Sequence, residues 1–274
     1  MAAPPRAEHG LPPPGALCNK SGSMVATADE TTSVTRHRRA VPVEIFRPTV
    51  AVPPWPCVVV VHEIFGANDD IRRIARRFAE AGYLAAVPDL MAGGMQLACV
   101  LRAMLALRAG AGPMVDELEA VIGLVEARSD VGRVGAAGFC MGGGFALLLG
   151  TRGRVAASAV FYGDTRSREE LARACPLTGG YGGRDRLFAS KGRAMIATLD
   201  ELGKEHDIRM YEDAGHSYMN QAGHPVMALL TRPLLHVQYD ATAAEDSWRR
   251  MLAFFARHLR EEAAGASAPG KDRR

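Results

Sequence analysis

The stretch Gly138-Phe139-Cys140-Met141-Gly142-Gly143-Gly144 decides the fold of this chain. The residues before it, 133–137, are apolar and typical of a strand, and the residues after it, 145–149, favour a helix. A strand that turns sharply into a helix needs glycines, because backbone segments crowd together there. Such a turn lifts Cys140 to the positive end of a helix, which stabilises a thiolate. The sequence therefore predicts a nucleophilic cysteine, with a buried structural cysteine as the alternative.

An acid and a histidine follow the cysteine, each at the end of a strand-like run. Residues 175–185 pass from an apolar start through glycines to Asp185, and residues 211–217 lead from a strand-like run to His216. The order nucleophile, acid, histidine is the one that α/β-hydrolases use. We predict that Cys140 attacks the substrate, that His216 activates it, and that Asp185 orients the imidazole. Taken singly, Asp185 also fits a helix cap and His216 a surface or core residue.

Several further stretches accompany this triad, namely residues 58–66, 82–90, 161–163, 182–185 and 214–217. Together with the turn around Cys140 they resemble the dienelactone hydrolase family, whose members are α/β-hydrolases with a cysteine nucleophile. The combination of His-Glu-Ile-Phe-Gly at 62–66 with Gly-Phe-Cys-Met-Gly-Gly at 138–143 is specific to this family. A generic esterase has His-Gly-Gly and a serine at those places. The resemblance implies an α/β-hydrolase fold with a mostly parallel central sheet and helices on both faces.

Glu63 directly follows the apolar residues 58–61, at the carboxyl end of an expected central strand, where open α/β sheets bind ligands. A solvated acid at a strand end is the alternative. By resemblance, the family's glutamate at this place contacts the nucleophile's thiol and helps to generate the thiolate when substrate arrives. A carboxylate near Cys140 opposes the thiolate in the resting enzyme, which limits oxidation. The backbone N–H groups of Ile64 and Met141 are the predicted oxyanion hole.

The composition predicts one folded domain, over residues 25–262. Hydrophobic residues make up 48% and charged residues 23% of the 274 residues, which is an ordinary globular balance. The proline- and alanine-rich residues 1–24 and the polar residues 263–274 are expected to be disordered. Strands alternate with helices between them, as in a mostly parallel sheet. The expected strands are residues 41–46, 58–61, 83–87, 133–137, 155–162, 176–181 and 208–211, and the expected helices cover residues 69–81, 97–108, 114–127, 145–149, 188–202 and 243–259.

Charge and cysteine content restrict the partners. The formal net charge of +3 is too small to indicate a nucleic acid or an anionic membrane as partner. The five cysteines are odd in number and lack metal-ligand spacing, so we expect reduced thiols, no metal site and a cytoplasmic protein. Neither a secretory signal nor an apolar run of membrane-spanning length is recognisable. The predicted reaction needs no cofactor, and the oligomeric state stays open.

We predict a hydrolase of small carboxylic esters or lactones that works through a thioester acyl-enzyme. Acyl transfer or thioester hydrolysis through the same intermediate, and a non-catalytic binding role on a hydrolase scaffold, are the alternatives. Dienelactone-cleaving relatives grip the substrate's carboxylate with one arginine shortly after the Pro-Asp-Leu segment and another four residues beyond the histidine. This chain has Met-Ala-Gly-Gly at 91–94 and Asn220 at those places. Because asparagine lacks the charge of arginine, we expect a neutral substrate.

Overall fold

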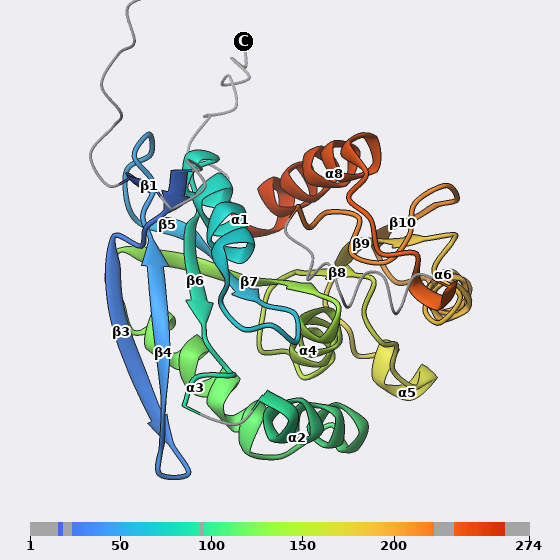
Figure 1. Ribbon diagram of the computed structural model, residues 1–274, viewed down its shortest axis with the longest axis horizontal. Helices are drawn as coiled ribbons and strands as arrows, with labels where there is room; N and C mark the ends of the chain where they lie inside the picture. The colour runs from blue at the N-terminus through green and yellow to red at the C-terminus, as the bar shows by residue number, and fades with distance from the viewer. Residues whose placement is uncertain (1–15, 19–23, 94–95, 222–232, 261–274) are drawn as a thin grey trace, which may run out of the picture.

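An eight-stranded mixed sheet forms the centre of the molecule, in the spatial order β10-β9-β8-β7-β5-β6-β4-β3 (Figure 1). The computed structural model describes residues 16–18, 24–93, 96–221 and 233–260. The six strands from β10 to β6 are parallel, whereas β4 and β3 are antiparallel additions at one edge. The strands are β3 (Glu30–Arg36), β4 (Arg39–Phe46), β5 (Trp55–Val61), β6 (Leu84–Pro88), β7 (Val131–Phe139), β8 (Ser158–Phe161), β9 (Leu177–Gly182) and β10 (His206–Tyr211).

Helices cover both faces of this sheet, as we predicted for an α/β-hydrolase fold. On one face α1 and α8 pack against the strands, and on the other lie α3, α4 and α6, with α2 outside α3 and α4 (Figure 1). The helices are α1 (Asp69–Glu80), α2 (Gln96–Ala109), α3 (Pro113–Glu126), α4 (Met141–Thr151), α5 (Arg168–Leu171), α6 (Ala189–Glu201) and α8 (Ala241–Leu259).

The central strand β5 shows why the sheet needs cover on both sides. Val58 and Val60 belong to the apolar core shared with α1 and α8, whereas Val59 and Val61 belong to the core shared with α3 and α4. Successive side chains of a strand point to opposite faces, so a continuous apolar run has to be buried twice. All four valines are fully buried. The run of valines therefore places the end of β5, and the residues that follow it, deep inside the molecule.

The edge strand β3 is an element that we did not predict. It alternates half-buried and exposed residues and contains one aliphatic side chain, Val34, so its hydrophobic signal is weak. Its position is determined by pairing with β4 along its whole length. The expected disorder of residues 1–24 falls largely outside the described residues and stays a prediction, as does that of residues 263–274. Within residues 1–24 the structure describes β1 (Ala16–Cys18), which pairs with β2 (Met24–Ala26).

The carboxyl ends of the parallel strands collect the residues singled out from the sequence. Glu63 follows β5, Cys140 follows β7, Asp185 follows β9, and His216 follows β10. In open α/β sheets this edge is where ligands bind. The topology therefore brings to one edge four residues that are up to 153 positions apart in the chain.

Candidate active site

Cys140 lies in a sharp turn between β7 and α4. Its φ of 54° and ψ of −117° fall in a region of backbone space that residues with side chains seldom adopt. The turn is held from both sides, because the Cys140 N–H donates to the Phe161 carbonyl at 3.0 Å and the Cys140 carbonyl accepts from the Gly143 N–H at 2.9 Å. The thiol is half-buried. This is the geometry of a nucleophile elbow, in which the side chain projects from the junction of strand and helix.

Glycines around Cys140 leave no room for side chains. A Cβ atom would lie 1.9 Å from the Gly142 oxygen if built on Gly138, and 2.1 Å from the Val61 oxygen if built on Gly142. Both separations are far below van der Waals contact, so only glycine lets α4 begin this close to the end of β5. Met141 is the first residue of α4, where backbone N–H groups have no acceptor within the helix. Ile64 follows β5 on the neighbouring backbone and is half-buried.

Asp185 and His216 form a buried pair. His216 Nδ1 lies 2.6 Å from Asp185 Oδ2, and the two side chains are 4% and 0% exposed. The second carboxylate oxygen accepts backbone N–H groups from Leu187 at 3.0 Å and Phe188 at 3.1 Å, which fixes the plane of the carboxylate. Because Asp185 accepts at Nδ1, the other ring nitrogen is available to Cys140, whose side chain interacts with the His216 ring. The three residues of the predicted triad are thus brought together.

Two aromatic rings flank the His216 imidazole. The ring centroids of Tyr162 and Phe188 lie 5.1 Å and 5.0 Å from that of His216. Burial lowers the pKa of His216, but the charges and hydrogen bonds of Cys140 and Asp185 outweigh burial and raise it to about 10. The largest raising contribution comes from Cys140, and Asp185 adds to it. The site therefore favours the charged form of the His216 imidazole.

Glu63 is buried within the same site and contacts the residue after His216. The Ser217 hydroxyl donates a hydrogen bond to Glu63 Oε1 at 2.7 Å. Burial raises the pKa of the Glu63 carboxyl, and the charge of Asp70 raises it further, while the Ser217 bond and His216 act in the opposite direction. Glu63 is thus tied to the loop that carries His216. Its contact with the Cys140 thiol, implied by the resemblance, stays a prediction.

Asn220 is occupied within a buried polar network. Its amide oxygen accepts from the Tyr162 hydroxyl at 2.5 Å, and its amide nitrogen donates to Asp70 Oδ2 at 2.9 Å. Arg73 Nε donates to the other Asp70 oxygen at 2.8 Å and a second nitrogen of Arg73 donates to the Met219 carbonyl at 3.2 Å. The network joins the first turn of α1 to the His216 loop and reaches Tyr162, which packs on the imidazole.

Burial suppresses the ionisation of two further cysteines, Cys57 and Cys175. Cys57 and Cys99 are buried, and burial raises the pKa of Cys57. Cys175 is half-buried, and burial raises its pKa to about 12. No group of three or more histidine, cysteine or acidic side chains within the described residues is arranged to hold a metal ion. In that same part of the chain no single helix is long and apolar enough to cross a membrane, and only the bent pair Leu97–Ala109 and Pro113–Glu126 meets the criteria of length and composition.

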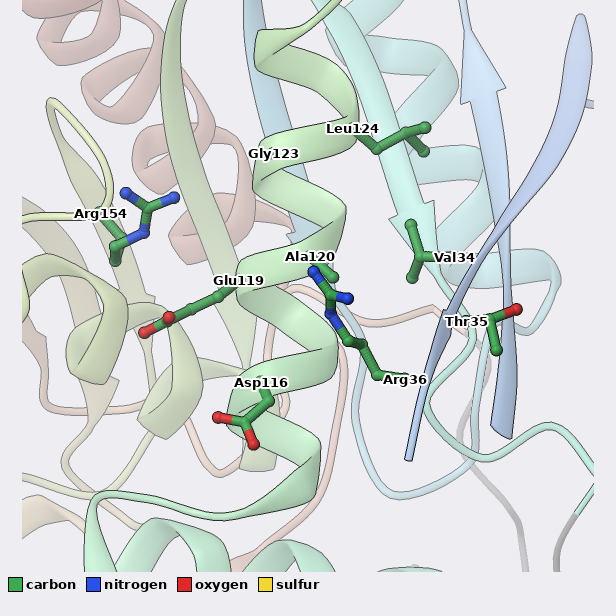
Figure 2. A pocket seen from close by; sticks show the side chains of 9 residues that line it. All are labelled: Val34, Thr35, Arg36, Asp116, Glu119, Ala120, Gly123, Leu124 and Arg154. Carbon is green, nitrogen blue, oxygen red and sulfur yellow. The ribbon is translucent and has the colours of Figure 1, made fainter. Parts of the chain in front are cut away.

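An open hollow of about 570 Å³ lies elsewhere, between β3 and α3 (Figure 2). Figure 2 shows that charged side chains surround it, including Arg36, Asp116, Glu119 and Arg154. None of its lining residues belongs to the site around Cys140. The hollow therefore adds nothing to the chemistry of the triad.

Sequence reasoning missed part of this site. Ser217 and Tyr162 lie inside the stretches that carry the family resemblance, so adjacency to His216 and to a strand end was the available signal for them. Phe188 and Asp70 gave no such signal, because each reaches the site only through tertiary packing. Tyr218 and Met219, which follow His216 in the same loop, are core residues, and the Tyr218 hydroxyl bonds Ser247.

The fold and this strand-end arrangement define an α/β-hydrolase. The sequence pattern of the dienelactone hydrolase family matches residues 41–259, and the chain belongs to that family. The Escherichia coli K12 protein named "Putative carboxymethylenebutenolidase" is 28% identical over 259 residues, covering 86% of this chain and 91% of that protein. The Pseudomonas putida carboxymethylenebutenolidase is 29% identical over 182 residues, covering 60% and 75% of the two chains. The chain is accordingly a hydrolase enzyme.

Solved structures agree on the fold. The structure of a dienelactone hydrolase-like promiscuous phosphotriesterase from metagenomic libraries superposes with a TM-score of 0.71 at 24% identity, covering 84% of this chain and 98% of that one. A thermophilic esterase from Thermogutta terrifontis superposes with a TM-score of 0.60 at 15% identity, covering 89% and 92%. At these identities the likeness concerns the fold alone.

Proposed function

We propose that this protein hydrolyses neutral carboxylic esters or lactones through a thioester on Cys140. The observation that carries the proposal is the buried Asp185–His216 pair, 2.6 Å between Oδ2 and Nδ1, whose imidazole also interacts with Cys140. A nucleophile, a base and an orienting acid in hydrogen-bond contact are the parts that acyl transfer requires.

Acylation begins when the Cys140 sulfur attacks the carbonyl carbon and the carbonyl oxygen takes up the negative charge. Backbone N–H groups of Ile64 and Met141 stabilise this oxyanion. The tetrahedral intermediate collapses, and the alcohol leaves with the proton held by His216. Asp185 keeps the imidazole in the correct tautomer and stabilises its charged form. In deacylation His216 removes a proton from water, the resulting hydroxide attacks the thioester, and the acid departs with Cys140 restored.

In this scheme Glu63 influences the reactivity of the Cys140 thiol. Its carboxylate opposes a thiolate nearby, so the position of Glu63 influences how much of Cys140 is ionised in the resting enzyme. The Ser217 hydroxyl, 2.7 Å from Oε1, holds Glu63 toward the His216 loop. The same bond ties the position of Glu63 to the loop that carries His216.

We infer a neutral substrate because the arginines near the site are either paired with an acid or exposed at the surface, and because Asn220 stands where an arginine would bind a carboxylate. Asn220, at one arginine position implied by the resemblance, carries no charge and is occupied by Tyr162 and Asp70. Arg73 is paired with Asp70. Arg184 and Arg186 on the acid loop are exposed.

Apolar side chains beside the triad fit a neutral acyl or alcohol group. Leu187 is 46% exposed next to Asp185, and Leu234 is 51% exposed where its carbonyl accepts the Arg186 N–H. Phe188 packs against His216. Exposed apolar side chains near the triad are favourable places for an apolar part of a substrate to bind.

The test compares Cys140→Ala with Cys175→Ala, a matched control because Cys175 is also half-buried. Both variants and the wild type are assayed on aryl esters, thioesters and unsaturated lactones. We expect the wild type and Cys175→Ala to turn over a neutral ester, and Cys140→Ala to lose at least about 10³-fold in kcat. Iodoacetamide should alkylate Cys140 before Cys175, whose pKa is about 12. Undiminished turnover by Cys140→Ala would overturn the mechanism.

A further inference from the structure

His62 precedes Glu63 and is fully buried, yet the proposed reaction gives it no part. Its ring bridges two backbone segments at the end of β5. His62 Nδ1 lies 2.5 Å from the carbonyl oxygen of Glu63, and the backbone N–H of Leu90 donates to His62 Nε2 at 3.0 Å. A buried imidazole with both nitrogens engaged by backbone groups has a fixed position and a fixed tautomer.

The two hydrogen bonds determine which nitrogen carries the proton. A backbone N–H can only donate, so Nε2 accepts from Leu90 and the hydrogen of the neutral ring is on Nδ1. Nδ1–H then donates to the Glu63 carbonyl. Burial lowers the pKa of His62, which favours this neutral form. Protonation at Nε2 would replace the Leu90 bond by two opposed donors.

The Glu63 carbonyl accepts from His62 and also, at 3.4 Å, from the Gly66 N–H in the turn that follows. The shorter bond, from His62, orients the peptide between Glu63 and Ile64. This peptide is trans, since Pro53–Pro54 is the cis bond among the described residues. In a planar trans peptide the C=O and N–H groups point in opposite directions. Drawing the Glu63 oxygen toward the His62 ring therefore turns the Ile64 N–H away from that ring. Rotation of this peptide plane would redirect both groups together.

We propose that His62 is a positioning residue of the oxyanion hole, holding the Glu63–Ile64 peptide so that the Ile64 N–H faces the developing oxyanion. The inference rests on the proposed function, because it assigns Ile64 as one of the two donors. In this role His62 transfers no proton during the reaction. It contributes only by orienting the backbone N–H of Ile64. The bond from Leu90 holds the ring itself in place.

Two amide substitutions separate the two bonds of His62. The amide nitrogen of asparagine falls near the position of Nδ1, so His62→Asn retains a donor for the Glu63 carbonyl and loses the Leu90 acceptor. The amide of glutamine falls near Nε2, so His62→Gln retains the Leu90 acceptor and loses the donor to Glu63. If His62 orients the oxyanion hole, His62→Gln is the more damaging change. If His62 only ties β5 to the segment after β6, His62→Asn is the more damaging one.

The measurements are kcat and KM for a neutral aryl ester, alkylation of Cys140 by iodoacetamide, and inhibition by an alkyl trifluoromethyl ketone. Alkylation occurs at a saturated carbon and forms no oxyanion, so it reports the thiol alone. Deleting an oxyanion donor costs roughly 10²–10³ in kcat, and we expect His62→Gln to lose about 10- to 100-fold because its N–H is misaligned and not removed. KM and the alkylation rate should stay near wild type. The ketone, which adds Cys140 to its carbonyl and leaves an oxyanion, should bind more weakly in proportion to the loss of kcat.

The outcomes distinguish this inference from the proposed function. Wild-type kcat in His62→Gln, or a larger loss in His62→Asn, overturns the role of His62 while Cys140-dependent turnover by the wild type stands. A parallel fall of alkylation and turnover also overturns it, since the thiol and not the oxyanion hole is then affected. Failure of the proposed function is seen separately, as turnover that survives Cys140→Ala. Thermal melting of both variants checks that they fold.

Discussion

Replacing Cys140 by glycine should stabilise the protein relative to replacing it by alanine, the reverse of the ordinary order. Cys140 has a φ of 54° and a ψ of −117°, which glycine adopts without steric cost and alanine does not. Both variants remove the sulfur, so the lost interactions with His216 cancel in the comparison. The remaining difference in stability between the two variants is the free-energy cost of the backbone conformation at position 140. Neither variant should turn over an ester.

The expected difference is about 1 kcal/mol. A residue with a side chain in such a backbone region costs of order 1–3 kcal/mol. Against this, glycine gains roughly 0.4–1 kcal/mol of conformational freedom in the unfolded chain, which favours alanine. The strain is maintained because the Phe161 carbonyl and the Gly143 N–H hold Cys140 from both sides. A difference of 1 kcal/mol corresponds to about 2–4 °C in Tm for a domain near this size.

The assay is reversible urea or thermal unfolding of the two variants, with a cysteine in ordinary backbone as the control. Cys57 lies within β5 and is fully buried. For Cys57→Gly and Cys57→Ala we expect the usual order, with alanine more stable, because glycine weakens a strand interior. If Cys140→Gly proves no more stable than Cys140→Ala, the turn stores no strain and the reasoning is wrong.

Four further predictions concern the chemistry. By NMR the pKa of His216 should lie near 10 and fall in Cys140→Ala, which removes the interaction with the sulfur; an unchanged pKa would contradict that interaction. Since the pKa of the unfolded imidazole is 6.5, the stability that His216 contributes should be complete below about pH 6.5 and lost as pH rises through 10. Glu63→Gln removes a carboxyl whose pKa is raised by burial, so turnover should slow and peroxide sensitivity change; identical pH–rate profiles and oxidation would make Glu63 structural. A neutral aryl ester should have a higher kcat/KM than a carboxylated dienelactone, because two missing arginine contacts are worth roughly 3–6 kcal/mol at about 1.5–3 each; a strong preference for the lactone would refute this.

The sequence predicted the parallel part of the sheet well, because buried parallel strands consist of continuous apolar runs such as residues 58–61. It missed β3, whose alternating, mostly polar residues resemble a surface loop until they are paired with β4. The residues of the site were predictable where a local motif carries them, as at Cys140 and at His216. Phe188 and Asp70 were not, because their roles depend on how the acid loop and α1 pack around the imidazole.

The hydrogen-bond network of Asp70, Asn220 and Tyr162 explains how residues far apart in the chain influence the position of the His216 imidazole. The Asp70 side chain is buried. One of its carboxylate oxygens is paired with Arg73, and the other accepts hydrogen bonds from the Asn220 amide and from the Gln221 N–H. Asn220 in turn fixes the Tyr162 hydroxyl, and the Tyr162 ring lies against His216. A buried network of this kind is worth most when every partner is satisfied, since a single loss leaves the next group unpaired. An arginine in place of Asn220 could not accept from Tyr162, so the neutral amide suits both the packing of the imidazole and the uncharged substrate.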